Sequence, residues 1–422
     1  MLNKLYALLL LLLFSVVPVM AQTDVVDDND DNDTTLVADS AWADSLVHRS
    51  DTLVWPKNVQ AEIEQLLKSD MFKTSQVGIM VYDLDADSTI FKHNERQLMR
   101  PASTMKTITA ITALDRLGGS YQFKTELCYT GRVDSTSLNG DVYCVGGFDP
   151  RFNRDDMQAF AEALRKMGVD TIRGNLYADC SMKDADKLGE GWCWDDDNPV
   201  LSSLVFQRKD IFMDKFLAKL REEGIEYSCF GASEKTCPAS AFTVCTRFHT
   251  MDQILHKMMK ESDNLYAESM YYQIAASTGN KWASAKSARN VERQLIRKIG
   301  LDPARYKLAD GSGLSLYNYL SAELEVKLLR YAYLNGNIMD HLKHSLPIGG
   351  VDGTLKKRMK NSFVHGNVKA KTGTLTGIIS LAGYCTAANG HELCFAIINN
   401  GIMHGNNARH FADKVCTLLC QP

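Results

Sequence analysis

The sequence predicts a mixed α/β (α+β) fold in which an inserted α+β domain interrupts a larger domain. Three observations carry this prediction. Strands and helices precede residue 122, short strand-like runs and two helical stretches fill residues 123–244, and helices followed by strands and a final helix occupy the rest. The elements before residue 123 and after residue 244 would together make one ordinary domain. The middle block is therefore interpreted as an insertion. We therefore expect residues 55–122 and 245–422 to form one domain and residues 123–244 another.

Each expected element follows from a local pattern. Apolar residues recur at helical spacing within residues 58–68, and residues 77–82 and 88–92 have the composition of a β-hairpin. The other expected helices lie at about 100–117, 155–166, 211–223, 250–260, 263–277, 284–299, 321–335 and 405–420. The other expected strands lie at about 125–128, 141–145, 171–178, 226–230, 367–374, 378–387 and 392–399.

The N-terminus has the pattern of a secretory signal peptide. Lys4 precedes the apolar run Leu5 to Val17, and the small residue Ala21 comes before a polar start. The run is short for a membrane-spanning helix, although an uncleaved anchor is the alternative interpretation. We expect residues 1–21 to be cleaved, residues 22–54 to form an acidic disordered tail, and the mature protein to be periplasmic or otherwise extracytoplasmic, with no stable membrane span.

Composition narrows the function classes. The chain has 422 residues, of which 45% are hydrophobic and 23% charged, as in an ordinary globular protein. The formal net charge is −4, from 47 basic and 51 acidic residues. An acidic balance does not favour binding to a phosphate backbone, so no nucleic-acid partner is expected.

The eleven cysteines indicate neither a metal site nor a cofactor. They contain no Cys-x-x-Cys pair, and disulfides are permitted in an exported protein. Asn389-Gly390 between two apolar runs predicts a two-residue hairpin in which Cys385 faces Cys394. That pair forms either a cross-strand disulfide or two free thiols.

Three short motifs occur in order: Ser103-Thr104-Met105-Lys106, Ser262-Asp263-Asn264 and Lys371-Thr372-Gly373. Each alone is weak, but all three in this order are typical of the penicillin-recognising serine enzymes. Ser103 opens a helix, where unpaired N–H groups favour developing negative charge. Lys106 lies three residues on, on the same helical face. A desolvated lysine with a lowered pKa can take the proton of a serine, so we expect Ser103 as nucleophile and Lys106 as its base.

The other two motifs supply groups around this pair. Ser262 lies between two helices and can pass a proton to a leaving amine, while Asn264 can hold a substrate amide and Asp263 caps the next helix. Lys371, Thr372, Gly373 and Thr374 end a strand whose edge can pair with an extended peptide. Lys371, Thr372 and Thr374 offer a cation and hydroxyls to a terminal carboxylate, and Gly373 permits close approach of the backbone. The amides of Ser103 and Thr374 are the expected oxyanion hole.

With these motifs, the sequence resembles the D-alanyl-D-alanine carboxypeptidase/endopeptidase family, the class C low-molecular-mass penicillin-binding proteins, over about residues 58–415. Further matching stretches are Arg100-Pro101-Ala102-Ser103, Gly146-Gly147-Phe148-Asp149-Pro150, Arg173-Gly174-Asn175-Leu176, Asp310-Gly311-Ser312-Gly313-Leu314-Ser315 and Leu346 to Leu355. The resemblance implies the penicillin-binding-protein/serine β-lactamase-like transpeptidase fold, an antiparallel sheet flanked by helices. It also implies cleavage of peptidoglycan stem peptides ending in D-Ala-D-Ala, or of their cross-links, through an acyl-enzyme on Ser103, with β-lactams as covalent inhibitors. The middle block is shorter than in members with two nested extra domains, and after Gly191 to Asp196 the usual stretch is replaced by Asp197 to Leu201.

Two other functions stay open at this point. A serine β-lactamase shares the acylation machinery, but it needs an added base for deacylation, and no Glu-x-x-Leu-Asn follows Asn264. A non-catalytic peptidoglycan-binding protein has no need of a nucleophile and a base together. The inserted block also disfavours a compact β-lactamase.

Overall fold

The computed structural model describes residues 53–194, 198–361 and 363–421, which belong to one structural unit. The expected signal peptide (1–21) and all but two residues of the expected acidic tail (22–54) lie outside the described residues.

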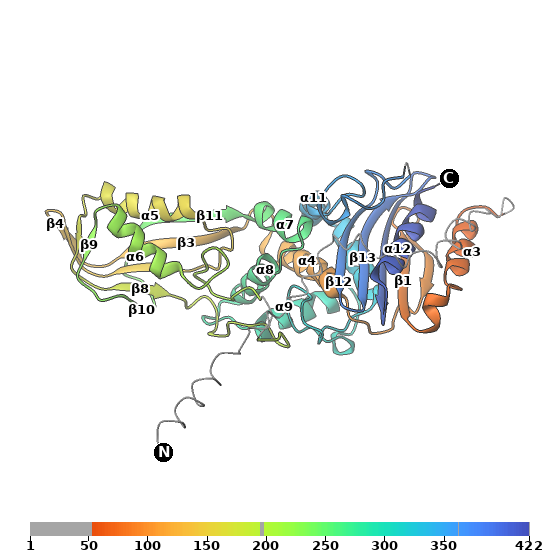
Figure 1. Cartoon of the computed structure of the whole chain (residues 1–422), viewed down its shortest axis with the longest axis horizontal. Coiled ribbons are helices and arrows are strands. Elements are labelled where there is room, and N and C mark those ends of the chain that lie inside the picture. The colour runs from red at the N-terminus through yellow and green to blue at the C-terminus, as the bar shows by residue number, and fades with distance from the viewer. Residues whose placement is uncertain (1–52, 195–197, 362, 422) are drawn as a thin grey trace, which may run out of the picture. The chain divides into compact units, whose positions relative to one another are not determined.

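A five-stranded antiparallel sheet forms the centre of the larger part of the molecule (Figure 1). Its strand order is β12-β13-β14-β1-β2, so segments from the two ends of the chain pair side by side. The strands are β1 (Gln76–Asp83), β2 (Ser88–His93), β12 (Lys369–Leu375), β13 (Ile378–Thr386) and β14 (Glu392–Asn400). The middle strands β13 and β14 are buried along nearly their whole length, because helices cover both faces.

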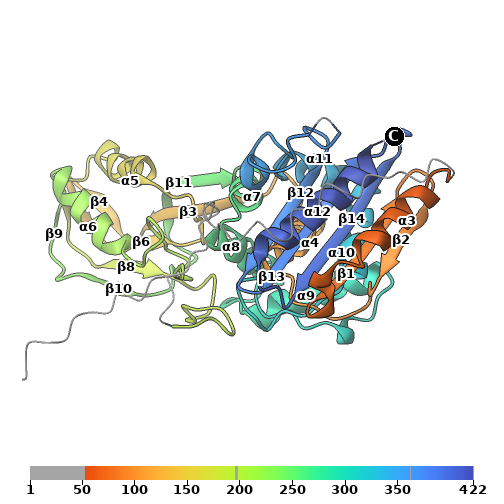
Figure 2. The same ribbon diagram turned by 45° about the vertical axis from the view of Figure 1, so that its right-hand side comes forward.

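Helices cover the two faces of this sheet differently. α12 and α3 lie on one face, and α10 packs on the other together with α4 and α8 behind it (Figure 2). The helices are α3 (Lys57–Leu66), α4 (Met105–Leu117), α7 (Met251–Lys260), α8 (Asn264–Ala276), α9 (Ala285–Lys298), α10 (Ala322–Tyr333), α11 (Gly336–Ser345) and α12 (Gly405–Cys420). The antiparallel sheet flanked by helices that was expected from the sequence is confirmed.

The middle of the chain builds two smaller sheets with their own apolar core. One sheet has the order β10-β8-β6-β3-β11 and the other β4-β5-β7-β9. Their strands are β3 (Gln122–Tyr129), β4 (Arg132–Asp134), β5 (Ser137–Asn139), β6 (Val142–Val145), β7 (Thr171–Ile172), β8 (Leu176–Asp179), β9 (Glu226–Tyr227), β10 (Ala232–Glu234) and β11 (Phe242–Thr250). Helices α5 (Arg154–Lys166) and α6 (Phe212–Glu222) pack against each other and contribute Phe160 and Phe216 to this core. The expected division points near residues 122 and 245 fall at or within β3 and β11, which pair with each other.

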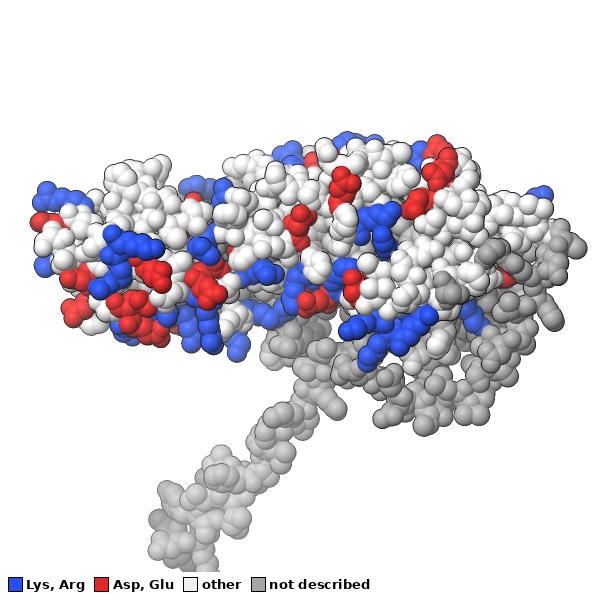
Figure 3. All heavy atoms as spheres, turned by 90° about the horizontal axis from the view of Figure 1, so that it is seen from above, with Lys and Arg blue, Asp and Glu red and all other residues white. Residues whose placement is uncertain are grey.

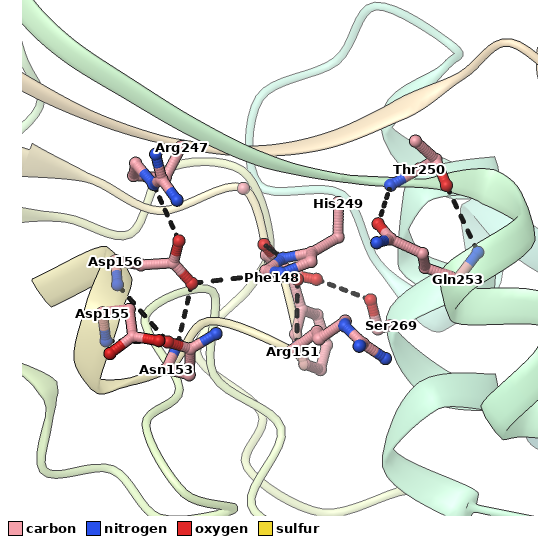
Figure 4. A network of polar contacts seen from close by, with 12 residues as sticks. Phe148, Arg151, Asn153, Asp155, Asp156, Arg247, His249, Thr250, Gln253 and Ser269 are labelled. Carbon is pink, nitrogen blue, oxygen red and sulfur yellow. Dashed lines mark hydrogen bonds and ion pairs between the residues drawn. The ribbon is translucent and has the colours of Figure 1, made fainter. Parts of the chain in front are cut away.

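A buried polar network joins this middle part to α8 (Figure 4). His249 of β11 lies 2.6 Å from Asp149, and Arg247 donates to Asp156 at 2.7 Å. The hydroxyl of Ser269 on α8 donates to the carbonyl of Phe148, whose φ of +49° is unusual for a residue other than glycine. The network therefore fixes α8, which begins at the second motif, against the start of the middle block.

The hairpin between β13 and β14 differs from the expected one. Thr386 pairs with Glu392, and the Ala387 amide donates to His391 O, so the loop has three residues, with Gly390 at φ +87°. This is the geometry of a turn followed by a left-handed glycine, and it shifts the register by one. Cys385 therefore faces Leu393 while Cys394 faces Tyr384, and the expectation that Cys385 faces Cys394 is wrong.

A shift of one residue moves a side chain to the opposite face of the sheet. The Cys394 thiol contacts Val326 O of α10, whereas the pKa of the buried Cys385 thiol is raised by Cys420 of α12 and by burial. We predict that peptide mapping under non-reducing conditions never recovers a Cys385–Cys394 link. Finding that linked peptide would contradict the register.

The surface and the helices add two observations. Basic and acidic side chains both occur across the face shown in Figure 3. Within the described ranges, none of the helices combines the length and the apolar character that crossing a membrane requires.

Candidate active site

Ser103 lies in a tight turn that leads into α4. The turn is a 3-10 helix, Ala102–Thr104, directly before Met105, and Ala102 is held at φ +49°. A left-handed residue with a side chain persists only where its surroundings enforce it. Here Gly313 presses against the turn, since a Cβ on Gly313 would lie 1.9 Å from Ala102 O. The result is a half-buried serine presented at the start of a buried helix.

Lys106 points at Ser103 from the first turn of α4. Its Nζ donates to Ser103 Oγ at 3.0 Å, to Asn264 Oδ1 at 2.7 Å and to Ser312 O at 2.7 Å. The side chain is fully buried. Burial lowers the pKa of Lys106 to about 8, against the opposing effect of Asp310, Glu268 and Asp263. A base of this pKa is partly neutral near neutral pH and already hydrogen-bonded to the hydroxyl it would deprotonate.

A rigid loop, residues 310–315, supplies the carbonyl of Ser312 to Lys106. Asp310 accepts hydrogen bonds from the Gly313 and Ser315 amides at 2.8 and 2.7 Å and from the Trp192 indole at 2.8 Å. Glu268 of α8 accepts from the Ser312 amide at 2.8 Å. Burial, with the Asp310 charge beside it, raises the pKa of Glu268 to about 8. These bonds hold the loop in the shape that places an acceptor on Lys106.

The second motif lies in the short connection between α7 and α8. Ser262 has φ +60°, Asp263 caps α8 by accepting from the Leu265 and Tyr266 amides, and Asn264 is the first residue of α8. The capping role expected for Asp263 is therefore present. Arg208, from the middle block, forms an ion pair with Asp263 at 2.6 Å. This tight connection places Asn264 against Lys106 and Ser262 against Lys371.

The third motif lies on β12, the edge strand of the large sheet. Lys371 Nζ donates to Ser262 Oγ at 2.8 Å and to Thr372 O at 2.7 Å. A Cβ on Gly373 would lie 2.1 Å from Ser380 Oγ and 3.0 Å from Ser103 N, so only glycine fits between the strand and the nucleophile's turn. Thr374 is half-buried on the same strand. The amide of Ser103 therefore faces the part of β12 that precedes Thr374.

The segment from Pro347 to Thr354 lies along the beginning of β12. Ile348 forms a bridge with Lys369, and the Ala370 amide donates to Pro347 O. Further along this segment, Thr354 accepts a hydrogen bond from Thr372 at 2.7 Å. Lys260, at the end of α7, binds the Asp352 carboxylate at 2.6 Å and thus ties the segment to the second motif. This segment therefore pairs with the beginning of β12 at Lys369 and Ala370.

The structure brings the three motifs next to one another, with Thr372, Gly373 and Thr374 on β12 and Gly373 packed against the turn of Ser103. Direct hydrogen bonds join Ser103, Lys106 and Asn264 in one group and Ser262 and Lys371 in another. No role was predicted for Glu268, Asp310, Asp352 or Thr354. Asp310, Asp352 and Thr354 lie in stretches that match the family, and Glu268 lies on α8 four residues after Asn264, so a signal existed. Their roles depend on long-range contacts that spacing does not reveal.

Comparison with known proteins gives a family and several relatives that match this chain. The profile of the D-Ala-D-Ala carboxypeptidase 3 (S13) family matches residues 59–205 and 199–421. The chain is 25% identical over 416 residues to D-alanyl-D-alanine carboxypeptidase DacB of Haemophilus influenzae, covering 79% of this chain and 87% of the relative. It is 27% identical over 440 residues to a D-alanyl-D-alanine carboxypeptidase of Actinomadura sp. (strain R39), covering 81% of each.

Solved structures share the fold. Penicillin binding protein 4 (dacB) of Haemophilus influenzae superposes with a TM-score of 0.78 at 22% identity, covering 85% of this chain and 99% of that one. A structure of the same protein complexed with a β-lactam gives a TM-score of 0.73 at 24% identity, covering 86% and 100%. The penicillin-binding-protein fold expected from the sequence is confirmed.

Proposed function

Since the chain belongs to the D-Ala-D-Ala carboxypeptidase 3 (S13) family and is a serine-type D-Ala-D-Ala carboxypeptidase, we propose that it cleaves peptidoglycan stem peptides, and the cross-links between them, through an acyl-enzyme on Ser103. The observation that carries the proposal is the 3.0 Å contact between a fully buried Lys106 amine and the Ser103 hydroxyl. A buried amine with a lowered pKa next to a serine suits proton abstraction.

The acylation step follows from the contacts around Ser103. Neutral Lys106 accepts the Ser103 proton as Oγ attacks the carbonyl carbon of the penultimate D-Ala. The amides of Ser103 and Thr374 stabilise the oxyanion. Because Lys371 donates to Ser262 Oγ, the Ser262 hydroxyl proton stays available for the departing amine, and Ser262 regains a proton from Lys106, which becomes neutral again. Neutral Lys106 then accepts a proton from the water that attacks the ester carbonyl, and as the ester C–O bond breaks this proton passes to Ser103 Oγ, which regenerates Ser103.

The substrate's terminal carboxylate would meet Lys371, Thr372 and Thr374, while its backbone pairs with β12, the edge strand of the large sheet. We predict that amidating the terminal D-Ala lowers kcat/KM by roughly 10- to 100-fold, because a charge-assisted hydrogen bond is lost. Steady-state rates on the free-acid and amidated forms of the same peptide measure this. Equal rates would contradict the assignment of the carboxylate site.

One assay distinguishes the proposed peptidase from the alternative, a serine β-lactamase. D-alanine release from a diacetylated tripeptide ending in D-Ala-D-Ala is measured beside penicillin hydrolysis. We expect repeated turnover of the peptide and a long-lived penicillin adduct, because an opened β-lactam stays tethered in the cleft. Rapid penicillin turnover without peptide cleavage would establish the β-lactamase, and neither reaction would favour a non-catalytic binding protein.

We further propose that the protein is exported and acts outside the cytoplasm, on the N-terminal pattern and the nature of the substrate. Residues 55–122 and 245–422 are proposed as the catalytic domain and residues 123–244 as the insertion. The position of Ser103, Lys106, Ser262, Asn264 and Lys371 outside the middle block supports this division.

A further inference from the structure

The hydroxyl of Thr354 lies against a residue that we assign to the carboxylate site. Thr372 Oγ1 donates to Thr354 Oγ1 at 2.7 Å. Thr372 is 9% exposed and Thr354 is half-buried, so the pair is partly shielded from water, which strengthens a hydrogen bond. Among the described residues, neither hydroxyl has another hydrogen-bond partner. The two side chains therefore form a separate pair of hydroxyls beside β12, the edge strand of the large sheet.

The turn that precedes Thr354 holds it in place. Lys260 Nζ donates to both carboxylate oxygens of Asp352, at 2.7 and 2.6 Å. Gly353 has φ +56°, and a Cβ at this position would lie 2.7 Å from Lys260 O, so the turn packs directly on the end of α7. Lys260 is the last residue of α7 and stands two positions before Ser262. These contacts attach the segment of Thr354 to the helix that leads into the second motif.

The backbone of Thr372 is restrained as well. Lys371 Nζ donates to Thr372 O at 2.7 Å, and Thr372 pairs with Leu381 in the register of β12 and β13. The positions of both hydroxyl oxygens are thus set by contacts of their own segments. A hydroxyl proton, in contrast, rotates to suit its acceptor. The direction of the hydrogen bond between Thr372 and Thr354 can therefore reverse without any movement of the backbone.

Two hydroxyls in contact place one proton between them and leave the other proton free. In the structure Thr372 supplies the proton between them, so its oxygen presents only lone pairs to an incoming ligand. An ionised carboxylate is an acceptor only and gains no hydrogen bond from Thr372 in that arrangement. When both hydroxyls rotate, Thr354 donates to Thr372 and the Thr372 proton becomes available to the carboxylate. A hydroxyl that accepts one hydrogen bond also donates a stronger one, because the bonds polarise each other.

We propose that Thr354 is a positioning residue for the substrate's terminal carboxylate: it donates its proton to Thr372 Oγ1 while Thr372 donates to the carboxylate. This inference rests on the proposed function, in which Thr372 binds that carboxylate. No covalent bond changes, and each hydroxyl keeps one proton throughout. Thr354 acts on the substrate through Thr372 and does not touch it. A charged carboxylate gains more from the strengthened donor than a neutral amide does, so Thr354 contributes to the preference for a free C-terminus.

The test compares the free-acid and amidated forms of a diacetylated tripeptide that ends in D-Ala-D-Ala. The measured quantity is the ratio of kcat/KM for the free acid to kcat/KM for the amide. Thr354→Val should lower this ratio by roughly fivefold, chiefly through a higher KM for the free acid, because one hydrogen bond to the binding hydroxyl is lost. Thr354→Ser keeps the hydroxyl and should restore the wild-type ratio. A purely structural defect would lower both rates together, so an unchanged ratio in Thr354→Val would overturn the proposal.

The matched control is Thr171→Val in the middle block. Thr171 lies on β7, is half-buried, and also uses its hydroxyl in one hydrogen bond, to Asp170 Oδ1 at 3.0 Å. This variant should keep the wild-type ratio. Thr354→Ala removes the same hydroxyl as Thr354→Val and should lower the ratio equally, which makes the result independent of how well valine packs.

A double variant tests the path of the effect. Thr372→Val removes the group through which Thr354 acts, so adding Thr354→Val should lower the ratio no further. A second fall of roughly fivefold in the double variant would refute the coupling. If wild type cleaves neither peptide, the proposed function fails; if it cleaves both equally well, the carboxylate site fails and this inference fails with it. A wild type that prefers the free acid, beside a Thr354→Val enzyme with the same preference, overturns this inference alone.

Discussion

Replacing Ser103 with alanine should abolish the covalent adduct with benzylpenicillin and lower peptide cleavage by at least about 1000-fold, because no other hydroxyl takes the place of the nucleophile. The side chain of Ser103 is half-buried, and Lys106, which donates to its hydroxyl, keeps Asn264 and Ser312 as acceptors, so the variant should fold like wild type. Intact-mass analysis followed by peptide mapping locates the adduct. In wild type it should lie on the peptide that contains Ser103.

The control for this variant is Ser233→Ala, which changes an exposed serine on β10. It should acquire the adduct at the wild-type rate. An adduct that persists in Ser103→Ala would show that another residue is acylated and would remove the basis of the proposed mechanism.

Replacing Lys106 with alanine should slow acylation by about 100-fold or more, the usual scale for a lost general base. The pH dependence of the acylation rate shows which protonation state of Lys106 is active. Burial lowers the pKa of Lys106 to about 8, so the neutral, proton-accepting form becomes more abundant as pH rises. Well below that value the wild-type rate should increase by about tenfold per pH unit, and this slope should be lost in Lys106→Ala.

Stopped-flow acylation with a chromogenic β-lactam follows both effects. Lys307→Ala is the matched control, because Lys307 is an exposed lysine whose amine lies over the ring of Tyr317. It should leave the rate and the slope unchanged. A Lys106→Ala enzyme with the wild-type slope would mean that another group accepts the Ser103 proton.

The sequence was sufficient to predict the elements whose patterns are local. Helix α8 could be placed from Asp263, which caps it, and the three motifs identified Ser103, Lys106 and Lys371 because each side chain's chemistry follows from its own segment. The antiparallel sheet came from the family resemblance, since pairing between β1 and β14 joins residues more than 300 positions apart.

Long-range contacts explain what could not be predicted. Asp310 and Glu268 act on Lys106 through backbone amides of a loop, and nothing in their own neighbourhoods indicates that placement. The register of the hairpin at Gly390 was predicted wrongly for a different reason. Asn-Gly suits both a two-residue turn and a turn followed by a left-handed glycine, and the pairing of Thr386 with Glu392 decides between them.

The bridge between Ile348 and Lys369 has a consequence for how the protein behaves in concentrated solution. An unpaired strand edge is a template on which another chain can add, and long exposed edges promote aggregation. Here the segment that contains Pro347 and Ile348 pairs with the first part of β12, at Lys369 and Ala370, and this shortens the edge that another strand could reach. A ligand of a few residues can pair with so short an edge, whereas a strand of another folded protein would collide with the segment. The same edge can thus remain open to small peptides without recruiting neighbouring molecules into a growing sheet.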